Sequence, residues 1–165
     1  MPKPINILVL CTGNSARSIL GEALFNYFGQ GRIRAYSAGS QPSGKVNPVA
    51  LETLEKHGIP LPEARSKSWD EFSVAGAPEI NYIFTVCASA AGETCPVWLG
   101  HPSTAHWGIP DPAHVEPMAA RVVAFEVAYQ QLAQRVRAFV ALPLETMSAA
   151  DVKAAATQIH EQAAA

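Results

Sequence analysis

The sequence has few cysteines and no excess of either charge, and these shortages exclude several classes of protein. Its three cysteines are an odd number without the dense pattern of a disulfide scaffold, and none has Cys-x2-Cys spacing, so a secreted scaffold and a zinc site fit poorly. A net charge of −2 leaves no polybasic stripe for nucleic acid or an anionic membrane. No apolar run approaches bilayer-spanning length. We therefore expect a protein of a reducing compartment, the cytoplasm, with no metal and with neither nucleic acid nor membrane as a partner.

Apolar side chains are abundant, at 48% of the chain, and they indicate a globular fold. A length of 165 residues suits one core and is too short for two ordinary domains. The apolar N-terminal segment is shorter than a usual signal sequence and leads directly into a polar loop, so we assign it to the fold. The sequence predicts one domain over residues 1–142 and a C-terminal extension over 143–165 that is helical.

Strands and helices alternate in the manner of a parallel α/β sheet. Strands are predicted at residues 5–10, 33–37 and 82–86, with helices starting near Ser18 and at Pro48 and a short helix at 66–72. Asn47 is expected to cap the helix that begins at Pro48, and Gly58 to end it.

A long amphipathic helix is predicted near the C-terminus, and its apolar stripe is expected to pack on the sheet. The opposite face is predicted to hold Arg121, Gln130, Gln134 and Arg135. The stripe consists of Met118, Val122, Phe125, Tyr129, Leu132, Val136 and Phe139.

The most informative stretch lies where the first predicted strand turns into the first predicted helix. A cysteine and an arginine flank five mostly small or polar residues there, which is enough chain to place a ring of backbone N–H groups around one anion. Gly13 would supply any positive φ that the ring needs. The stretch is Cys11, Thr12, Gly13, Asn14, Ser15, Ala16, Arg17 and Ser18.

This loop predicts a tetrahedral oxyanion site with a reactive thiolate. The N-terminus of the following helix adds partial positive charge, and Arg17 can hold two anion oxygens in a bidentate fork. These features should lower the pKa of the Cys11 thiol below its usual ~8.5, and a hydroxyl of Ser18 or Ser15 could lower it further. The simpler interpretation is a buried cysteine beside a turn with a surface arginine. The preceding strand, the following helix and the loop composition favour the anion site.

A second cysteine pair, Cys87 and Cys95, follows the third predicted strand. Seven intervening residues suit neither a thioredoxin-type pair nor a metal site, and a disulfide would require the segment to move. Because carboxyl ends of parallel strands meet at one edge, Cys87 and Cys11 should share a rim. Two ordinary core cysteines are the simpler alternative, but beside an activated Cys11 a redox relay explains the pair better.

Asp111 lies between two prolines in a stiff loop that could hold its carboxyl over the anion pocket as a general acid. Most Asp-Pro pairs are merely turns. Asp111 by itself is therefore weak evidence for a general acid, and it becomes a candidate only together with the anion loop.

Taken together, these motifs resemble the arsenate reductases built on the low-molecular-weight tyrosine phosphatase fold, over about residues 5–139. The resemblance implies a single three-layer α/β domain with a four-stranded parallel sheet flanked by helices. It also implies reduction of arsenate to arsenite, as in arsenic resistance, without a metal or organic cofactor. The matching motifs are residues 9–18, 36–39, 46–48, 85–87 with 95–96, and 106–108 with 111–113.

The resemblance also implies a role for each residue. Cys11 would be the nucleophile, Arg17 the oxyanion clamp and Asp111 the acid that assists loss of water or hydroxide from arsenic. Cys87 would attack the arsenylated Cys11, and Cys95 would resolve the resulting disulfide. Residues 12–18 would bind arsenate and related oxyanions. The reductant would be thioredoxin or glutathione with glutaredoxin, and thioredoxin is favoured.

The match also covers a monovalent-cation site of some relatives, with one departure. Asn14, Glu22 and Ser37 match its members, whereas Lys67 falls where those relatives have an acidic residue, so the resemblance predicts that the lysine replaces the charge of the ion.

Two other functions use the same residues. A protein tyrosine phosphatase would use the loop and Asp111, but Ala113 stands where phosphatases of this fold usually have an aromatic residue, and dephosphorylation needs neither Cys87 nor Cys95. A non-enzymatic redox sensor would bind an oxyanion and signal through a disulfide, although no partner-binding element is evident.

Overall fold

The computed structural model describes residues 3–61, 63–87 and 103–164. Within these ranges, four parallel strands form one sheet in the order β2, β1, β3, β4. The strands are β1 (Ile5–Cys11), β2 (Ile33–Gly39), β3 (Tyr82–Thr85) and β4 (Ser103–His106). The three strands predicted from the sequence are confirmed. The sequence pattern did not locate β4, because four mostly polar residues at a sheet edge have no apolar run.

Strand β1 lies in the middle of the sheet, and its composition follows from that position. It pairs with β2 on one side and β3 on the other, and Ile7, Leu8, Val9 and Leu10 have no exposed surface. A strand covered on both faces reads as a continuous apolar run instead of an alternating one. The carboxyl end of this buried strand is Cys11.

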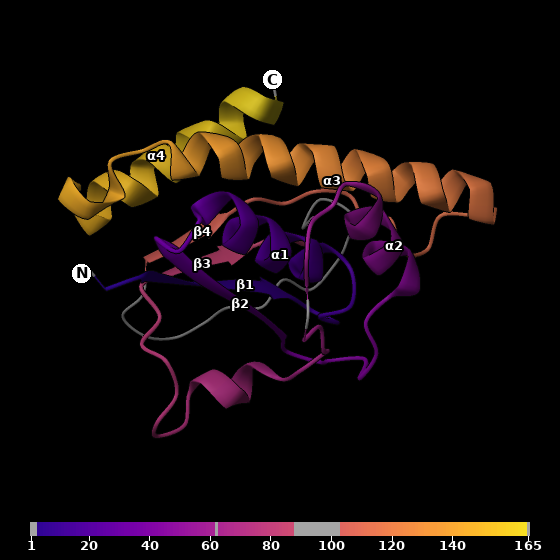
Figure 1. Ribbon diagram of the computed structural model, residues 1–165, viewed down its shortest axis with the longest axis horizontal. Helices are drawn as coiled ribbons and strands as arrows, with labels where there is room; N and C mark the ends of the chain where they lie inside the picture. Colours follow the sequence, from indigo (N-terminus) through magenta and orange to yellow (C-terminus); the bar gives the residue numbers. More distant parts are fainter. Residues whose placement is uncertain (1–2, 62, 88–102, 165) are drawn as a thin grey trace.

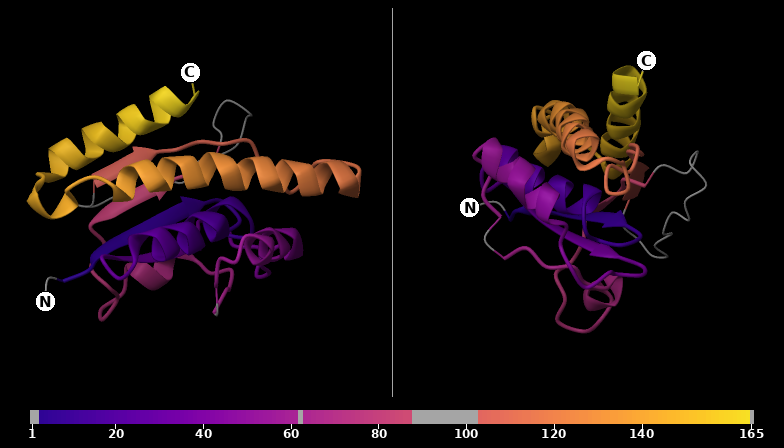
Figure 2. Two further views of the ribbon diagram at one scale, coloured as in Figure 1. Left: turned by 45° about the horizontal axis from the view of Figure 1, so that its top comes forward. Right: turned by 90° about the vertical axis from the view of Figure 1, so that its right-hand side faces the viewer.

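Helices cover one face of the sheet, as Figures 1 and 2 show. They are α1 (Arg17–Gly29), α2 (Pro48–Lys56), α3 (Met118–Val140) and α4 (Ala149–Ala164), with the short 3₁₀ helix η3 (Leu144–Thr146) between the last two. The Asn47 side chain accepts a hydrogen bond from the Val49 amide, and Gly58 has a φ of 71°, so the predicted start and stop signals of α2 are confirmed.

The other face is covered, within the described ranges, by the 3₁₀ helix η1 (Trp69–Phe72) and the loops around it. Its Phe72 ring lies 5.5 Å from that of Tyr36 on β2. The helix predicted at 66–72 is thus a shorter 3₁₀ turn, which begins after Ser68 because the serine hydroxyl accepts from the Asp70 amide.

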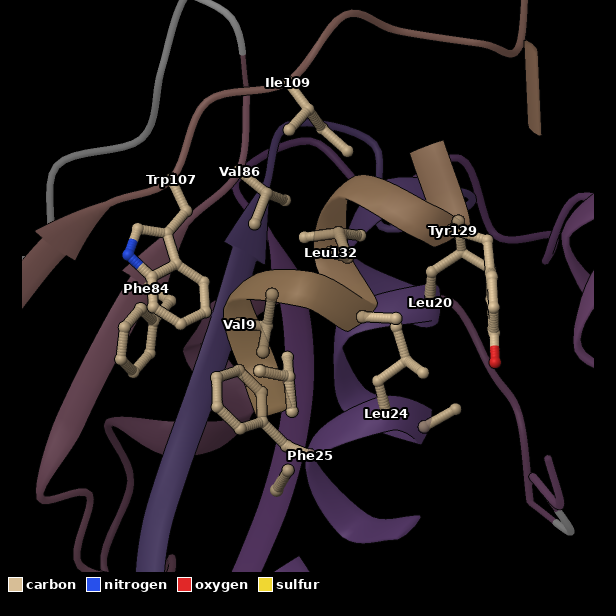
Figure 3. Close-up of a cluster of buried hydrophobic side chains, with 14 of the residues drawn as sticks. Val9, Leu20, Leu24, Phe25, Phe84, Val86, Trp107, Ile109, Tyr129 and Leu132 are labelled. Carbon is tan, nitrogen blue, oxygen red and sulfur yellow. The ribbon is translucent and has the colours of Figure 1, made fainter. Parts of the chain in front are cut away.

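The core between sheet and helices combines aliphatic side chains with a cluster of aromatic rings (Figure 3). Phe84 of β3 lies 4.3 Å from Trp107 and 5.1 Å from both Phe25 and Phe139, measured between ring centroids. These contacts join α1, α3 and the segment after β4 into one packed unit.

The C-terminal helix α4 packs against α3 and the edge strand β4. Val152 and Ala156 are buried, and the Trp107 indole donates to the Ala156 carbonyl at 2.8 Å. The placement of Arg135 on an open polar face of α3 was wrong: its side chain is only 4% exposed, because α4 covers it and His160 accepts from its Nε at 3.0 Å.

Candidate active site

Cys11 lies at the carboxyl end of β1, and the chain then turns through residues 12–16 into α1. The cysteine is a thiol and is 6% exposed. The backbone carbonyls of the turn point outward: that of Thr12 accepts from Gln41, that of Gly13 from Ser43, and that of Ser15 from Asn47, at 2.8 to 3.0 Å. These carbonyls are held in hydrogen bonds to residues outside the turn, an arrangement compatible with the predicted anion site, in which the N–H groups of the turn face the anion.

The positive φ of the turn belongs to Asn14 and not to Gly13, which corrects the sequence interpretation. Asn14 has a φ of 46° and is fully buried. Its side-chain oxygen accepts from the Lys67 amide and its Nδ2 donates to the Ser18 hydroxyl, each at 2.8 Å. Asparagine tolerates the left-handed region, and these two hydrogen bonds stabilise it there.

Gly39, the last residue of β2, is where the turn requires a glycine. A Cβ at this position would lie 2.4 Å from the Thr12 carbonyl oxygen and 2.9 Å from that of Cys11. No side chain fits at such distances, so the absence of Cβ is what lets the turn fold against the sheet. In the sequence, Gly39 stood out only as part of the motif at residues 36–39. Its steric role follows from the strand register, which pairs it with Cys11.

Arg17 opens α1 and reaches across the end of the sheet to the loop after β4. It is 3% exposed, its Nη1 donates to the Ile109 carbonyl at 3.0 Å, and its Nη2 lies 3.6 Å from Asp111 Oδ2. The structure therefore brings together Cys11, Arg17 and Asp111, which are far apart in sequence. Asp111 is also tied to its own turn, since its Oδ1 accepts from the Ala113 amide at 2.9 Å.

A cavity of about 380 Å³ opens between these groups. It is lined by all the residues from Cys11 to Arg17 and by Asp111, and Ser43, Asn47, Ala113 and His114 complete its described walls. The described walls contain no Phe, Tyr or Trp ring, and the imidazole of His114 lies with its Nε2 3.8 Å from Asp111 Oδ2. The sequence analysis did not identify Ser43 or His114; only the backbone path of the turn brings them to the cavity.

A buried pair of opposite charges lies beside the turn. Lys67 Nζ is 3.7 Å from Glu22 Oε1, and the side chains are 8% and 13% exposed. The Ser37 hydroxyl donates to Glu22 at 2.6 Å, and Lys67 Nζ donates to the Arg65 carbonyl at 3.1 Å. Burial raises the pKa of Glu22, against the opposing effects of Ser37 and Lys67, and burial lowers the pKa of Lys67, against the attraction of Glu22. The ammonium thus lies beside Glu22, whereas Asn14 accepts from the Lys67 backbone amide and Ser37 donates to Glu22.

Cys87 follows β3 at the same carboxyl rim as Cys11, as predicted. It is fully buried and disulfide-bonded. Its neighbour Val86 donates to the Leu10 carbonyl at 3.0 Å, one residue before Cys11. Cys95 lies outside the described residues. Among those that are described, no three His, Cys, Asp or Glu side chains gather to hold a metal ion, and no helix is long and apolar enough to cross a membrane.

Comparison with known proteins matches the chain to one family and to several named enzymes. The family model of low molecular weight phosphotyrosine protein phosphatase matches residues 6–154. An arsenate reductase of Shouchella clausii is 30% identical over 134 residues, which cover 81% of this chain and 93% of the relative.

Solved structures give the same fold. An arsenate reductase from Archaeoglobus fulgidus superposes with a TM-score of 0.67 at 25% identity, covering 82% of this chain and 99% of the other. The tyrosine phosphatase Wzb from Escherichia coli K30, in complex with sulphate, superposes with a TM-score of 0.62 at 23% identity over 82% of this chain and 96% of its own. The second likeness supports the fold alone.

Proposed function

Because this chain belongs to the low molecular weight phosphotyrosine protein phosphatase family and its curated relatives are arsenate reductases, we propose that it reduces arsenate to arsenite through a three-cysteine relay. The observation that carries the proposal is the position of Cys87. It is a second buried cysteine on the rim that holds Cys11 and Arg17, where hydrolysis of a phosphate ester has no use for a thiol.

In the first step, the Cys11 thiolate attacks arsenic(V) bound by the N–H groups of residues 12–17 and by Arg17. A sulfur–arsenic bond forms and one arsenic–oxygen bond breaks. Asp111 donates a proton to the departing oxygen, which leaves as water. The buried guanidinium and the N-terminus of α1 stabilise the oxyanion, and they favour the thiolate form of Cys11.

The relay starts once an external dithiol has reduced the disulfide of Cys87, and in the second step the Cys87 thiolate attacks the Cys11 sulfur. The sulfur–arsenic electron pair leaves with arsenic, which departs as arsenite, and a Cys11–Cys87 disulfide remains. The two cysteine sulfurs have then supplied the two electrons. Cys95 next attacks Cys87, releasing Cys11 as a thiolate and moving the disulfide to a Cys87–Cys95 pair that an external dithiol reduces. We assign this reaction to the cytoplasm, where such thiols are available, and favour thioredoxin over glutathione with glutaredoxin as reductant.

A tyrosine phosphatase activity is the second candidate, because Asp111 is placed to protonate a leaving phenolate as well as water. The cavity argues against it as the main reaction, since its described walls offer no Phe, Tyr or Trp ring to stack on a phenyl ring. A redox sensor without catalysis would form the same disulfides but would not turn over.

The test is arsenite release from the full chain with thioredoxin and its reductase, with glutathione and glutaredoxin, and with no reductant. We expect multiple turnovers with thioredoxin and one arsenite per enzyme without reductant. The variant Cys95→Ser should release one arsenite and then stall as a Cys11–Cys87 disulfide, visible by peptide mass mapping. Sustained turnover of this variant with thioredoxin would remove Cys95 from the relay. Hydrolysis of aryl phosphate without any arsenite would establish the phosphatase instead.

A further inference from the structure

The segment from His106 to Ile109 connects Cys87 to the arginine of the anion loop. It continues the pairing of β4 with β3 beyond the strand ends: the Trp107 amide donates to the Thr85 carbonyl at 2.7 Å, and the Ile109 amide to the Val86 carbonyl at 3.2 Å. The carbonyl of Ile109 then accepts from Arg17. Figure 3 shows Val86, Trp107 and Ile109 close together near the end of β1. We call residues 106–109 the brace, because they fix the chain around Cys87 relative to Arg17.

Gly108 brings the brace into direct contact with Cys87. A Cβ on Gly108 would lie 2.7 Å from the Cys87 carbonyl oxygen and 2.7 Å from His106 Nε2. The His106 ring and the Cys87 carbonyl therefore both lie against the α-carbon of Gly108. The other ring nitrogen of His106 is 2.7 Å from the Thr85 hydroxyl, so the imidazole occupies a fixed place between two strand ends. A shift of the brace would shift Cys87.

The C-terminal helix α4 packs against this brace. The Trp107 indole, fully buried, donates to the Ala156 carbonyl, and the His160 ring lies 6.4 Å from that of His106. His160 also accepts from Arg135 Nε at 3.0 Å, which fastens α4 to α3. The family match ends at residue 154, inside α4, so His160 lies beyond the part of the chain that the family model matches.

From these contacts we infer that α4 is a positioning element of the thiol relay: through Trp107 and His160 it holds the brace, and with it Cys87, in reach of the arsenylated Cys11. The inference rests on the proposed function. The main effect of α4 is expected in the second chemical step, because the anion loop has its own hydrogen bonds to residues 41, 43, 47 and 67, although Arg17 of that loop also donates to the brace at Ile109. His160 is a positioning residue and touches neither substrate nor reacting sulfur.

The Arg135 contact makes this support sensitive to acid. Nδ1 of neutral His160 can accept from the guanidinium, whereas a protonated ring has no acceptor and adds a second positive charge. Burial lowers the pKa of His160, and the charges of Arg135 on α3 and His106 on β4 lower it further, opposed by Glu161 on α4 itself. Protonation of His160 therefore weakens the attachment of α4.

The experiment compares His160→Leu, His160→Gln and the control Gln158→Leu, an exposed position on the same helix. Arsenite release in a single turnover of pre-reduced enzyme, without added reductant, reports the first and second steps together, so a loss with phosphate binding intact points to a step after anion binding. Protection of Cys11 from iodoacetamide by inorganic phosphate measures the anion loop. We expect His160→Leu to slow arsenite release on the order of tenfold, within the ~100-fold that a displacement of about 1 Å can cost. Phosphate protection should stay within about twofold of wild type, and Gln158→Leu should match wild type in both measurements.

The conservative variant separates positioning from general loss of structure. In His160→Gln the side-chain oxygen can accept from Arg135 without titrating, so arsenite release should be near wild type at pH 7.5. The ratio of its rate to the wild-type rate should rise as the pH falls to 5.5. Unchanged arsenite release by His160→Leu, or an equal loss of phosphate protection, would overturn the inference. If the wild type itself releases no arsenite, the proposed function fails, and the inference with it.

Discussion

Replacing Lys67 by methionine should make stability depend on pH through Glu22. The ammonium lies 3.7 Å from the Glu22 carboxylate, and both side chains are nearly enclosed. At an effective dielectric constant of ~20, that separation corresponds to an attraction of about 4 kcal/mol. Methionine fills similar volume and leaves Glu22, within the described ranges, with a hydrogen bond from the Ser37 hydroxyl. An uncompensated carboxylate in this place would take up a proton instead of staying charged.

That protonation sets the size of the effect. The ordinary pKa of the carboxyl is 4.5, the value it has in the unfolded chain. Keeping Glu22 neutral in the folded state at pH 7 costs about 1.36 kcal/mol for each of the 2.5 pH units above this value, or about 3.4 kcal/mol. At pH 5.5 the same cost is about 1.4 kcal/mol. Because the pKa of Glu22 is already raised in the wild type, these figures are upper limits for the difference between wild type and variant.

The sign follows from proton uptake. A carboxyl whose pKa is raised on folding binds more protons in the folded state than in the unfolded state. The free energy of unfolding is therefore at its full value below pH 4.5 and falls as the pH rises above it. Urea unfolding of wild type, Lys67→Met, Glu22→Gln and the double variant at pH 5.5 and 7 measures this. We expect Lys67→Met to lose up to about 3 kcal/mol at pH 7 and clearly less at pH 5.5, and the double variant to lose that pH dependence. A deficit of Lys67→Met that is the same at both pH values would refute the reasoning.

Three further variants test the anion site. Cys11→Ser should abolish arsenite release and any aryl phosphatase activity, because the hydroxyl has neither the low pKa nor the redox capacity of a thiol; wild-type rates would refute the assignment. Asp111→Asn should slow single-turnover arsenite release by about 10²- to 10⁴-fold with phosphate protection of Cys11 largely intact, and an unchanged rate would leave Asp111 a turn residue. Gly39→Ala should displace the Thr12 carbonyl, weaken phosphate protection and lower the free energy of unfolding by about 1–3 kcal/mol, and phosphate protection equal to wild type would contradict the steric argument.

Local patterns in the sequence were sufficient for the elements that carry the site. The apolar run before Cys11 predicted β1, Asn47 and Pro48 predicted the start of α2, and the apolar stripe predicted α3. These features depend on short-range physics: an N-cap hydrogen bond, the fixed φ of proline and the period of a helix. The anion site was predicted from the Cys11–Arg17 spacing together with the preceding strand, the following helix and the composition of the turn, and it stays a prediction; the carbonyls of residues 12, 13 and 15 are compatible with it, since each accepts from a residue outside the turn.

Other features depend on contacts between segments distant in the sequence, and there the local patterns failed. Arg135 fits a polar helix face by period, but α4 covers it, since the docking of a second helix leaves no trace in the first. Gly13 seemed the natural residue for a positive φ, yet Asn14 takes it because the Lys67 amide and the Ser18 hydroxyl complete its hydrogen bonds. Strand β4 is too short and polar to stand out, and it forms because β3 offers an open edge.

The sequence by itself determined the local pattern on which the proposed oxyanion site rests: a thiol and an arginine that flank a turn between a buried strand and a helix. Only the tertiary structure decided what surrounds that site. The approach of Asp111 to Arg17, the ammonium beside Glu22 and the contact of Arg17 with the brace at Ile109 each join residues more than 40 positions apart. Such pairings arise from sheet order and helix docking, which are set by the burial of the whole core and not by any local signal.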